Sequence, residues 1–319
     1  MSYFTQLFNL MIEVMLPLAL LVAVGGLWPR FFPDTPVDAA RSLLNRMVMY
    51  LFLPCILFSV ASTTPISRDL LSVPLLVGIG SLLAGVILYI AMYLTPLGRG
   101  LPDATRAILV VGGMFGNTFN VGVPVLVFFF GREATRYAVF NDMLMTMPLV
   151  WSVGVWICTR LGAHRESEQP AVWRVMLSMP PIWAFILGTG SQQLGLTYAP
   201  LTAATAFIGQ ATIPVTLFVL GMTIPWRNLK PRPEILSMAA AKLIAVPVIV
   251  WSAAKLLYIP MGEAQYAAVV EGTTPAMVTT LLLADRFRLD SGAAALLIGW
   301  TTILFWVTLP AIMALGLIR

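Results

Sequence analysis

Long apolar runs separated by short polar breaks make up most of the sequence. Each run holds about 20 residues, the length that an α-helix needs to cross a hydrocarbon core of about 30 Å. Breaks rich in charged residues, Pro or Gly divide the chain into ten such segments. The segments are 9–28, 40–61, 70–95, 105–129, 134–160, 172–195, 200–224, 233–258, 264–284 and 292–318. The pattern predicts an all-α polytopic membrane protein with ten transmembrane helices.

The scarcity of charge excludes a water-soluble domain. The 14 acidic and 19 basic residues are 10% of the 319 residues, whereas a soluble protein carries about 25%. Two cysteines are too few for a disulfide scaffold, and the apolar content excludes disorder. The net charge of +5 comes without any Lys/Arg cluster, so the expected partner is a lipid bilayer and not a nucleic acid.

Lys and Arg are distributed unevenly between two sets of loops. Loops after odd-numbered segments hold twelve of them: Arg30, Arg41, Arg99, Arg106, Arg160, Arg165, Arg174, Arg227, Lys230, Arg232, Arg286 and Arg288. Loops after even-numbered segments and the termini hold five: Arg68, Arg132, Arg136, Lys255 and Arg319. Because basic loops tend to stay cytoplasmic, we expect the odd loops to be cytoplasmic and both termini to be external.

The sequence resembles itself at an offset of 160 residues. The stretch 51–58 aligns with 211–218 at Pro, Leu and Phe, and the same register aligns 103–112 with the second half at Ala and Gly. The halves 1–160 and 161–319 therefore form two predicted repeats of five helices each. Because five is odd, the second repeat enters the membrane upside down. Inverted repeats are an architecture of secondary transporters, whose sites lie near the bilayer midplane at discontinuous helices.

Two segments related by this repeat carry helix-breaking residues at mid-span. Segment 105–129 contains Gly116-Asn117-Thr118-Phe119-Asn120-Val121-Gly122-Val123-Pro124, and segment 264–284 contains Glu271-Gly272-Thr273-Thr274-Pro275. Broken helices leave backbone N–H and C=O groups free to bind a solute. We therefore predict a substrate site at these two breaks. The alternative is a Pro kink whose Asn side chains bond neighbouring helices.

The motif at 116–124 resembles the fourth-helix motif of bacterial auxin efflux carrier (AEC) family transporters, in which an Asn-Thr pair is followed by Gly-x-Pro. The stretches 213–222 and 274–276 also look typical of that family. The resemblance implies two inverted five-helix repeats, divided into a scaffold and a transport domain. Broken helices 4 and 9 would cross at their midpoints, as in the related bile-acid sodium symporter fold.

The same resemblance implies carriage of small organic anions, mono- or dicarboxylates such as malonate or malate, across the plasma (inner) membrane of a bacterium. Plant auxin carriers have a long central loop, and the corresponding connection is short here, so auxin is not assumed as the substrate. By position in the motifs, the implied substrate-binding residues are Gly116, Asn117, Thr118, Asn120, Gly122, Pro124, Thr273, Thr274 and Pro275. Half-helix N-termini would attract a carboxylate, and free carbonyls at half-helix C-termini could hold a cation.

Ionisable residues within apolar segments are costly and are functional candidates for that reason. Glu271, one turn before Pro275, is the candidate proton carrier or cation ligand; the alternative is a carboxyl group bonded within the bundle. Asp142 is the second coupling candidate. Lys242 is expected to pair with an acid, to meet the substrate anion or to snorkel to an interface. No cofactor and no metal are expected, and the coupling ion is H⁺ or Na⁺.

An enzyme is excluded on the sequence. The chain has one His, no His-Glu-x-x-His and no other metal or nucleophile motif, so no catalytic residue is expected. The sequence thus predicts a secondary active transporter of small organic anions, working by alternating access at a midplane site between the broken helices. The alternatives are a sodium-coupled symporter of a larger amphipathic anion, and a channel or receptor-like membrane protein. A homodimer is left open.

Overall fold

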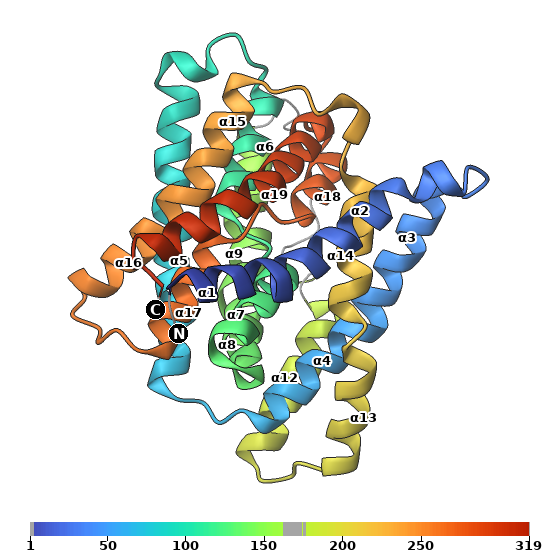
Figure 1. The fold of residues 1–319 in the computed structure, drawn as a ribbon, viewed down its shortest axis with the longest axis vertical. Coiled ribbons are helices and arrows are strands. Elements are labelled where there is room, and N and C mark those ends of the chain that lie inside the picture. Colours follow the sequence, from blue (N-terminus) through green and yellow to red (C-terminus); the bar gives the residue numbers. More distant parts are fainter. Residues whose placement is uncertain (1–2, 162–173, 175–176, 319) are drawn as a thin grey trace. The chain divides into compact units, whose positions relative to one another are not determined.

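The structure is a computed structural model that describes residues 3–161, 174 and 177–318 (Figure 1). Seven of its helices are continuous, apolar and long enough to cross a membrane. They are Leu7–Phe31, Val37–Thr63, Arg68–Tyr93, Arg132–Arg160, Ala199–Thr223, Pro233–Leu256 and Ser291–Ala314. Each lies within a few residues of one predicted segment. The prediction of a helical, multi-pass membrane protein is therefore confirmed.

The other three predicted segments are not continuous helices of this length. The first residues of segment 172–195 lie mostly outside the described residues, and its described part contains α12 (Pro180–Gln193). Segments 105–129 and 264–284 are each interrupted near the middle. The total of ten spans stays a prediction.

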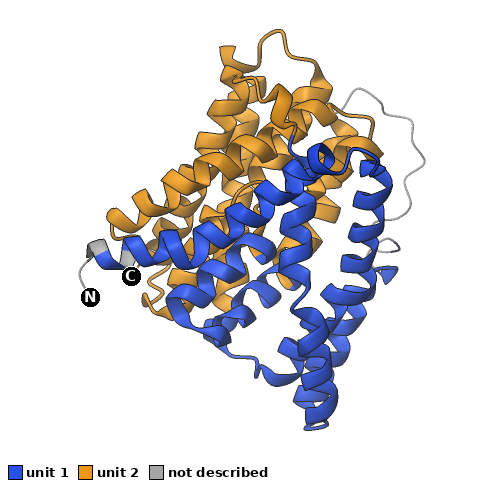
Figure 2. Ribbon diagram, turned by 45° about the vertical axis from the view of Figure 1, so that its right-hand side comes forward, with its two compact units in different colours: residues 1–70, 119–143, 170–224 blue, residues 71–118, 144–169, 225–319 orange. Residues whose placement is uncertain are grey.

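The chain folds into two compact units, and each unit draws on both halves of the sequence (Figure 2). The first unit comprises residues 1–70, 119–143 and 170–224, and the second comprises 71–118, 144–169 and 225–319. The predicted repeats divide the chain differently, at residue 160, because they concern internal symmetry and not contact. That division stays a prediction.

Tight helix crossings hold the first unit together. Its main helices are α1 (Tyr3–Asn9), α2 (Leu16–Phe31), α3 (Val37–Met47), α4 (Leu53–Thr63), α7 (Val123–Phe130), α8 (Thr135–Asn141), α12, α13 (Ala199–Gly209) and α14 (Thr212–Thr223). A Cβ atom on Gly25 of α2 would lie 2.0 Å from the Phe218 carbonyl oxygen of α14. A Cβ on Gly221 of α14 would lie 2.0 Å from the Val22 carbonyl oxygen. Glycine at both positions lets the two backbones touch, as is common between helices in membranes.

The second unit contains α6 (Asp103–Met114), the helix before the first interruption. Its main helices are α5 (Arg68–Tyr93, in this unit from residue 71), α6, α9 (Met147–Leu149), α10 (Val155–Arg160), α15 (Pro233–Ala240), α16 (Val246–Leu256), α17 (Glu263–Thr273), α18 (Thr279–Arg286) and α19 (Ser291–Ala314). On α6, Gly113 receives the Leu88 side chain of α5, and Gly112 receives the Leu297 side chain of α19. Two adjacent glycines therefore let two helices approach α6 closely.

Several spans contain short π-helical stretches where the α-helical ladder is offset. Within the described residues these are Leu10–Met15, Val48–Phe52, Thr118–Gly122, Asp142–Thr146, Val150–Gly154 and Ala241–Ala245. Such stretches are rare in proteins and are frequent at functional sites. Three of them carry residues singled out from the sequence: Asn120, Asp142 and Lys242.

Candidate functional site

The first interruption follows α6 and is shorter than predicted. Phe115 is extended, with φ −109° and ψ 128°, and residues 118–122 already form a π-helical turn. Pro124, predicted to shape the break, lies in the first turn of α7 instead. Proline supplies no N–H donor to the helical ladder, and the π-helical turn at residues 118–122 lies just before it. Gly122 is likewise helical, with φ −65° and ψ −46°.

The second interruption follows α17. The helix continues to Thr273, and Thr274 is then extended, with φ −64° and ψ 146°. Pro275 explains this conformation, because the residue before a proline is pushed out of the helical region. The chain resumes as α18 at Thr279. The break is therefore at residues 274–278, slightly later than the sequence prediction.

The two interruptions pair with each other inside the second unit. Gly116 and Ala276 form an isolated antiparallel bridge. The N–H of Asn117 donates to the Pro275 carbonyl oxygen at 2.7 Å, and the N–H of Met277 donates to the Phe115 carbonyl oxygen at 3.3 Å. Backbone groups that leave the helices thus satisfy one another, as a low-dielectric interior requires. The bridged residues are 160 positions apart, which is also the offset of the sequence repeat.

Gly116 has no room for a side chain. A Cβ atom there would lie 2.2 Å from Thr274 Oγ1 and 3.2 Å from Lys242 Nζ. The Thr274 hydroxyl is itself held by a 2.7 Å hydrogen bond to the Glu271 carbonyl oxygen. The structure therefore brings together Gly116, Asn117 and Thr118 with Thr273, Thr274 and Pro275 in one unit, all of them buried.

Lys242 also reaches this place. Its side chain is 1% exposed, and Nζ donates to the Gly272 carbonyl oxygen at 3.2 Å, at the negatively polarised end of α17. Glu271, the residue before Gly272, is fully buried and carries the opposite formal charge. The snorkelling interpretation is therefore wrong. Lys242 was a candidate because it is a charged residue in the middle of an apolar run. Hydropathy alone could not predict that its side chain lies at the interruption.

The other predicted residues belong to the first unit by their contacts. They are Asn120, Gly122, Pro124 and Asp142. Asp142 is buried and begins a π-helical stretch directly after α8. Its neighbour Asn141 is fully buried, and neither polar atom of its side chain has a hydrogen-bond partner within the described residues. No pattern in the sequence singled out Asn141.

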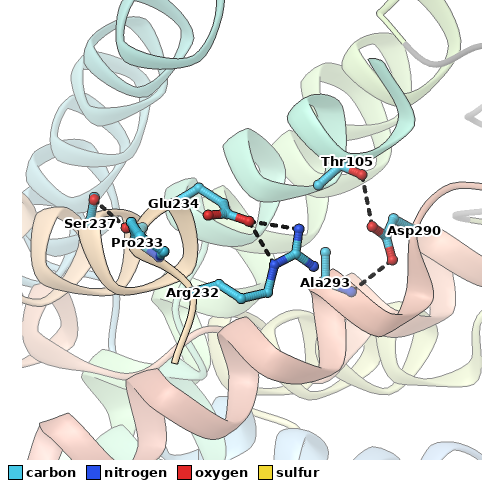
Figure 3. Close-up of polar contacts among 7 residues, drawn as sticks. All are labelled: Thr105, Arg232, Pro233, Glu234, Ser237, Asp290 and Ala293. Carbon is cyan, nitrogen blue, oxygen red and sulfur yellow. Dashed lines mark hydrogen bonds and ion pairs between the residues drawn. The ribbon is translucent and has the colours of Figure 1, made fainter. Parts of the chain in front are cut away.

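Polar contacts at one end of the second unit hold α6 and α19 together (Figure 3). Thr105 Oγ1 donates to Asp290 Oδ2 at 2.7 Å, and Asp290 Oδ1 accepts the N–H of Ala293 at 2.8 Å, so one carboxylate caps α19 and binds α6. Beside them, Arg232 and Glu234 form an ion pair at 2.6 Å. Thr105 and Asp290 adjoin loops that were predicted to share one side of the membrane, and their contact agrees with that prediction.

One protein family and several proteins resemble the chain over most of its length. A family model described as "Membrane transport protein" matches residues 10–313. An "Uncharacterized transporter" of Methanothermobacter thermautotrophicus is 25% identical over 271 residues, 84% of this chain and 87% of the relative. Another from Methanocaldococcus jannaschii is 26% identical over 292 residues, 87% and 90% of the two chains. A Rhizobium meliloti protein named "Putative malonate transporter" is 25% identical over 324 residues, 95% and 94% of the two chains.

Proposed function

Because the chain belongs to the membrane transport protein family of auxin efflux carriers, we propose that it is a secondary active transporter of small organic anions. Members of this family are membrane transporters, so the chain is not an enzyme. The proposed mechanism is alternating access, with the substrate bound where the two interrupted segments meet. The proposed location is the plasma (inner) membrane of a bacterium.

The bridge between Gly116 and Ala276 is the observation that carries this proposal. Discontinuous helices that meet at repeat-related positions are how many secondary transporters build their sites. The 160-residue separation of the bridged pair supports an inverted repeat, since positions related by a two-fold axis meet on that axis. The proposed ligands are Asn117, Thr118, Asn120, Thr273 and Thr274. Gly116, Gly122 and Pro124 would shape the first segment and Pro275 the second.

A carboxylate is the proposed substrate group. The helical segments Thr118–Phe130 and α18 each begin just after an interruption, so their N-terminal ends are positively polarised. Lys242 adds a buried ammonium group to the second unit. Malonate is the first candidate, because one relative is named for malonate transport.

Glu271 and Asp142 are the proposed coupling residues. Lys242 Nζ donates a hydrogen bond to the Gly272 carbonyl oxygen. A sodium ion at this end of α17 would use that oxygen as one of its ligands. That contact favours H⁺ over Na⁺ at Glu271. Glu271→Gln is then expected to lose uptake driven by a pH gradient while keeping substrate exchange. Intact pH coupling in this variant would remove Glu271 from the role.

Uptake into liposomes tests the function. Purified protein is reconstituted and offered labelled malonate, malate, acetate and a bile acid, each with and without Na⁺ and a pH gradient. We expect saturable uptake of at least one small carboxylate without a requirement for Na⁺. Uptake of the bile acid alone, dependent on Na⁺, would favour the amphipathic-anion symporter, and non-saturable flux would favour a channel. Failure with all the acids would contradict the proposal.

A further inference from the structure

The backbone N–H of Ala276 cannot be satisfied by the segment with which it pairs. The two hydrogen bonds of the bridge flank the pair, from Asn117 to Pro275 and from Met277 to Phe115. Gly116 and Ala276 are thus a non-hydrogen-bonded pair, in which the N–H and C=O groups of both residues point away from each other. Ala276 is 1% exposed, so its N–H needs a partner from another element.

Thr301 of α19 provides that partner. Its Oγ1 accepts the N–H of Ala276 at 3.0 Å, and the side chain is fully buried. The same hydroxyl donates back to the Leu297 carbonyl oxygen at 2.7 Å, with the Ile298 carbonyl oxygen 3.1 Å away. Because its proton points back into its own helix, the oxygen presents its lone pairs to Ala276. Thr301 is an oriented acceptor.

One turn of α19 contacts both interrupted helices. Leu297 packs its Cδ2 against Gly112 of α6, 2.7 Å from where a Cβ would lie, and Thr301 holds the segment after α17. The start of α19 is bound to α6 by the Thr105–Asp290 hydrogen bond (Figure 3). The repeat offset makes Asn141 the equivalent of Thr301, so a polar side chain occupies this position in both halves.

We propose that Thr301 is a positioning residue for the substrate site. By fixing Ala276 it holds the Pro275 carbonyl against the N–H of Asn117, and so sets the place of the Asn117 side chain. Thr301 does not touch the substrate and acts through the bridge. This inference rests on the proposed function for its effect on transport. Its effect on the bridge is independent of that function.

Two substitutions at this position and one beside it test the proposal. Thr301→Val keeps the shape and removes the acceptor, whereas Thr301→Ser restores a hydroxyl. Thr302→Val is the matched control, because the Thr302 hydroxyl donates to the Ile298 carbonyl oxygen of its own helix and to nothing in the bridge. All variants are compared with the wild type in lipid nanodiscs and in liposomes.

The first readout is hydrogen exchange of the peptide that contains residues 274–278, which needs no substrate. Loss of a buried hydrogen bond is expected to speed exchange there about tenfold in Thr301→Val, with wild-type rates in Thr301→Ser and Thr302→Val. The second readout is malonate uptake. Thr301→Val should raise KM about tenfold with little change in the maximal rate per folded molecule, and Thr301→Ser should restore KM.

Each outcome decides a separate point. Wild-type exchange in Thr301→Val would overturn the proposal at its first step. Faster exchange with unchanged KM would show that Thr301 only stabilises the fold, and would overturn the positioning role. Wild-type protein that takes up none of the acids contradicts the proposed function instead, and the exchange rates still decide whether Thr301 holds the bridge.

Discussion

Gly116 lies where an interrupted helix, a threonine hydroxyl and a buried ammonium group come together. A methyl group at this position would lie 2.2 Å from Thr274 Oγ1 and 3.2 Å from Lys242 Nζ. Real Cβ contacts are never as short as the first of these, so Thr274 must move or the bridge must open. The residue is therefore glycine for steric reasons, and its place in the bridge connects those reasons to the site.

Gly116→Ala is expected to abolish anion uptake and to lower stability by about 1–3 kcal/mol, the usual effect of overpacking a filled interior. Thermal unfolding in detergent and uptake in liposomes measure the two effects. Gly154→Ala is the control in the same unit, because its nearest neighbour, at 3.4 Å, makes ordinary van der Waals contact. Full uptake by Gly116→Ala would show that the bridge geometry does not matter for transport.

Lys242 and Glu271 are two ionisable residues buried in the second unit. Their side chains carry opposite formal charges. Removing one charge of such a pair leaves the other uncompensated in a low-dielectric interior, so Lys242→Met and Glu271→Gln should each lose about 3–5 kcal/mol of stability. The double variant should lose less stability than the sum of the two single losses, and thermal unfolding in detergent measures all three losses. Strictly additive losses would show that the two groups are not coupled.

At the scale of elements, α2 and α14 approach until their backbones touch. Gly25 and Gly221 face each other's helices, and each is opposed by a carbonyl oxygen that cannot move without its helix. In membranes, such small residues allow close packing, which takes the place of a hydrophobic driving force between helices. The crossing joins the first half of the sequence to the second within one unit.

Gly25→Ala should force this crossing apart. We expect a loss of about 1–3 kcal/mol in the free energy of unfolding, measured in detergent, with the substrate KM of any remaining folded protein unchanged. Gly190→Ala on α12 is the control, because nothing lies within 4 Å of its would-be Cβ and alanine favours helix. Equal stability of the two variants would contradict the packing role of Gly25.

The sequence predicted where helices begin and end far better than which helices pack against each other. Gly, Pro and Asn inside an apolar run are local signals, and they located both interruptions to within a few residues. Which helices pack together could not be read, because lipid and protein interior are both apolar. Adjacent leucines of α5 illustrate the limit: Leu75 is 55% exposed, and Leu76 is fully buried. Thr301 was missed for a related reason, since one threonine among many in a span carries no local mark of its partner.

At the scale of the whole molecule, the arrangement of basic residues makes a prediction about sidedness. With Cys55 and Cys158 replaced, single cysteines are introduced at Gly100, in an odd loop, and at Gly195, in an even loop. A Cβ atom at either position would have nothing within 4 Å, and labelling compares their access to an impermeant maleimide in intact cells. We expect labelling at position 195 only. Labelling at position 100 alone would reverse the proposed orientation, and equal labelling would contradict the odd–even pattern.

A carrier whose substrate site lies at the paired interruptions exchanges its substrate across the membrane. Counterflow tests it most directly: liposomes loaded with unlabelled malonate are diluted into trace labelled malonate, and the label inside is followed over time. We predict transient, saturable accumulation for the wild type and none for Asn117→Ala, with the exposed Asn45→Ala behaving as wild type. Accumulation by Asn117→Ala equal to that of the wild type would show that the paired interruptions are not the substrate site.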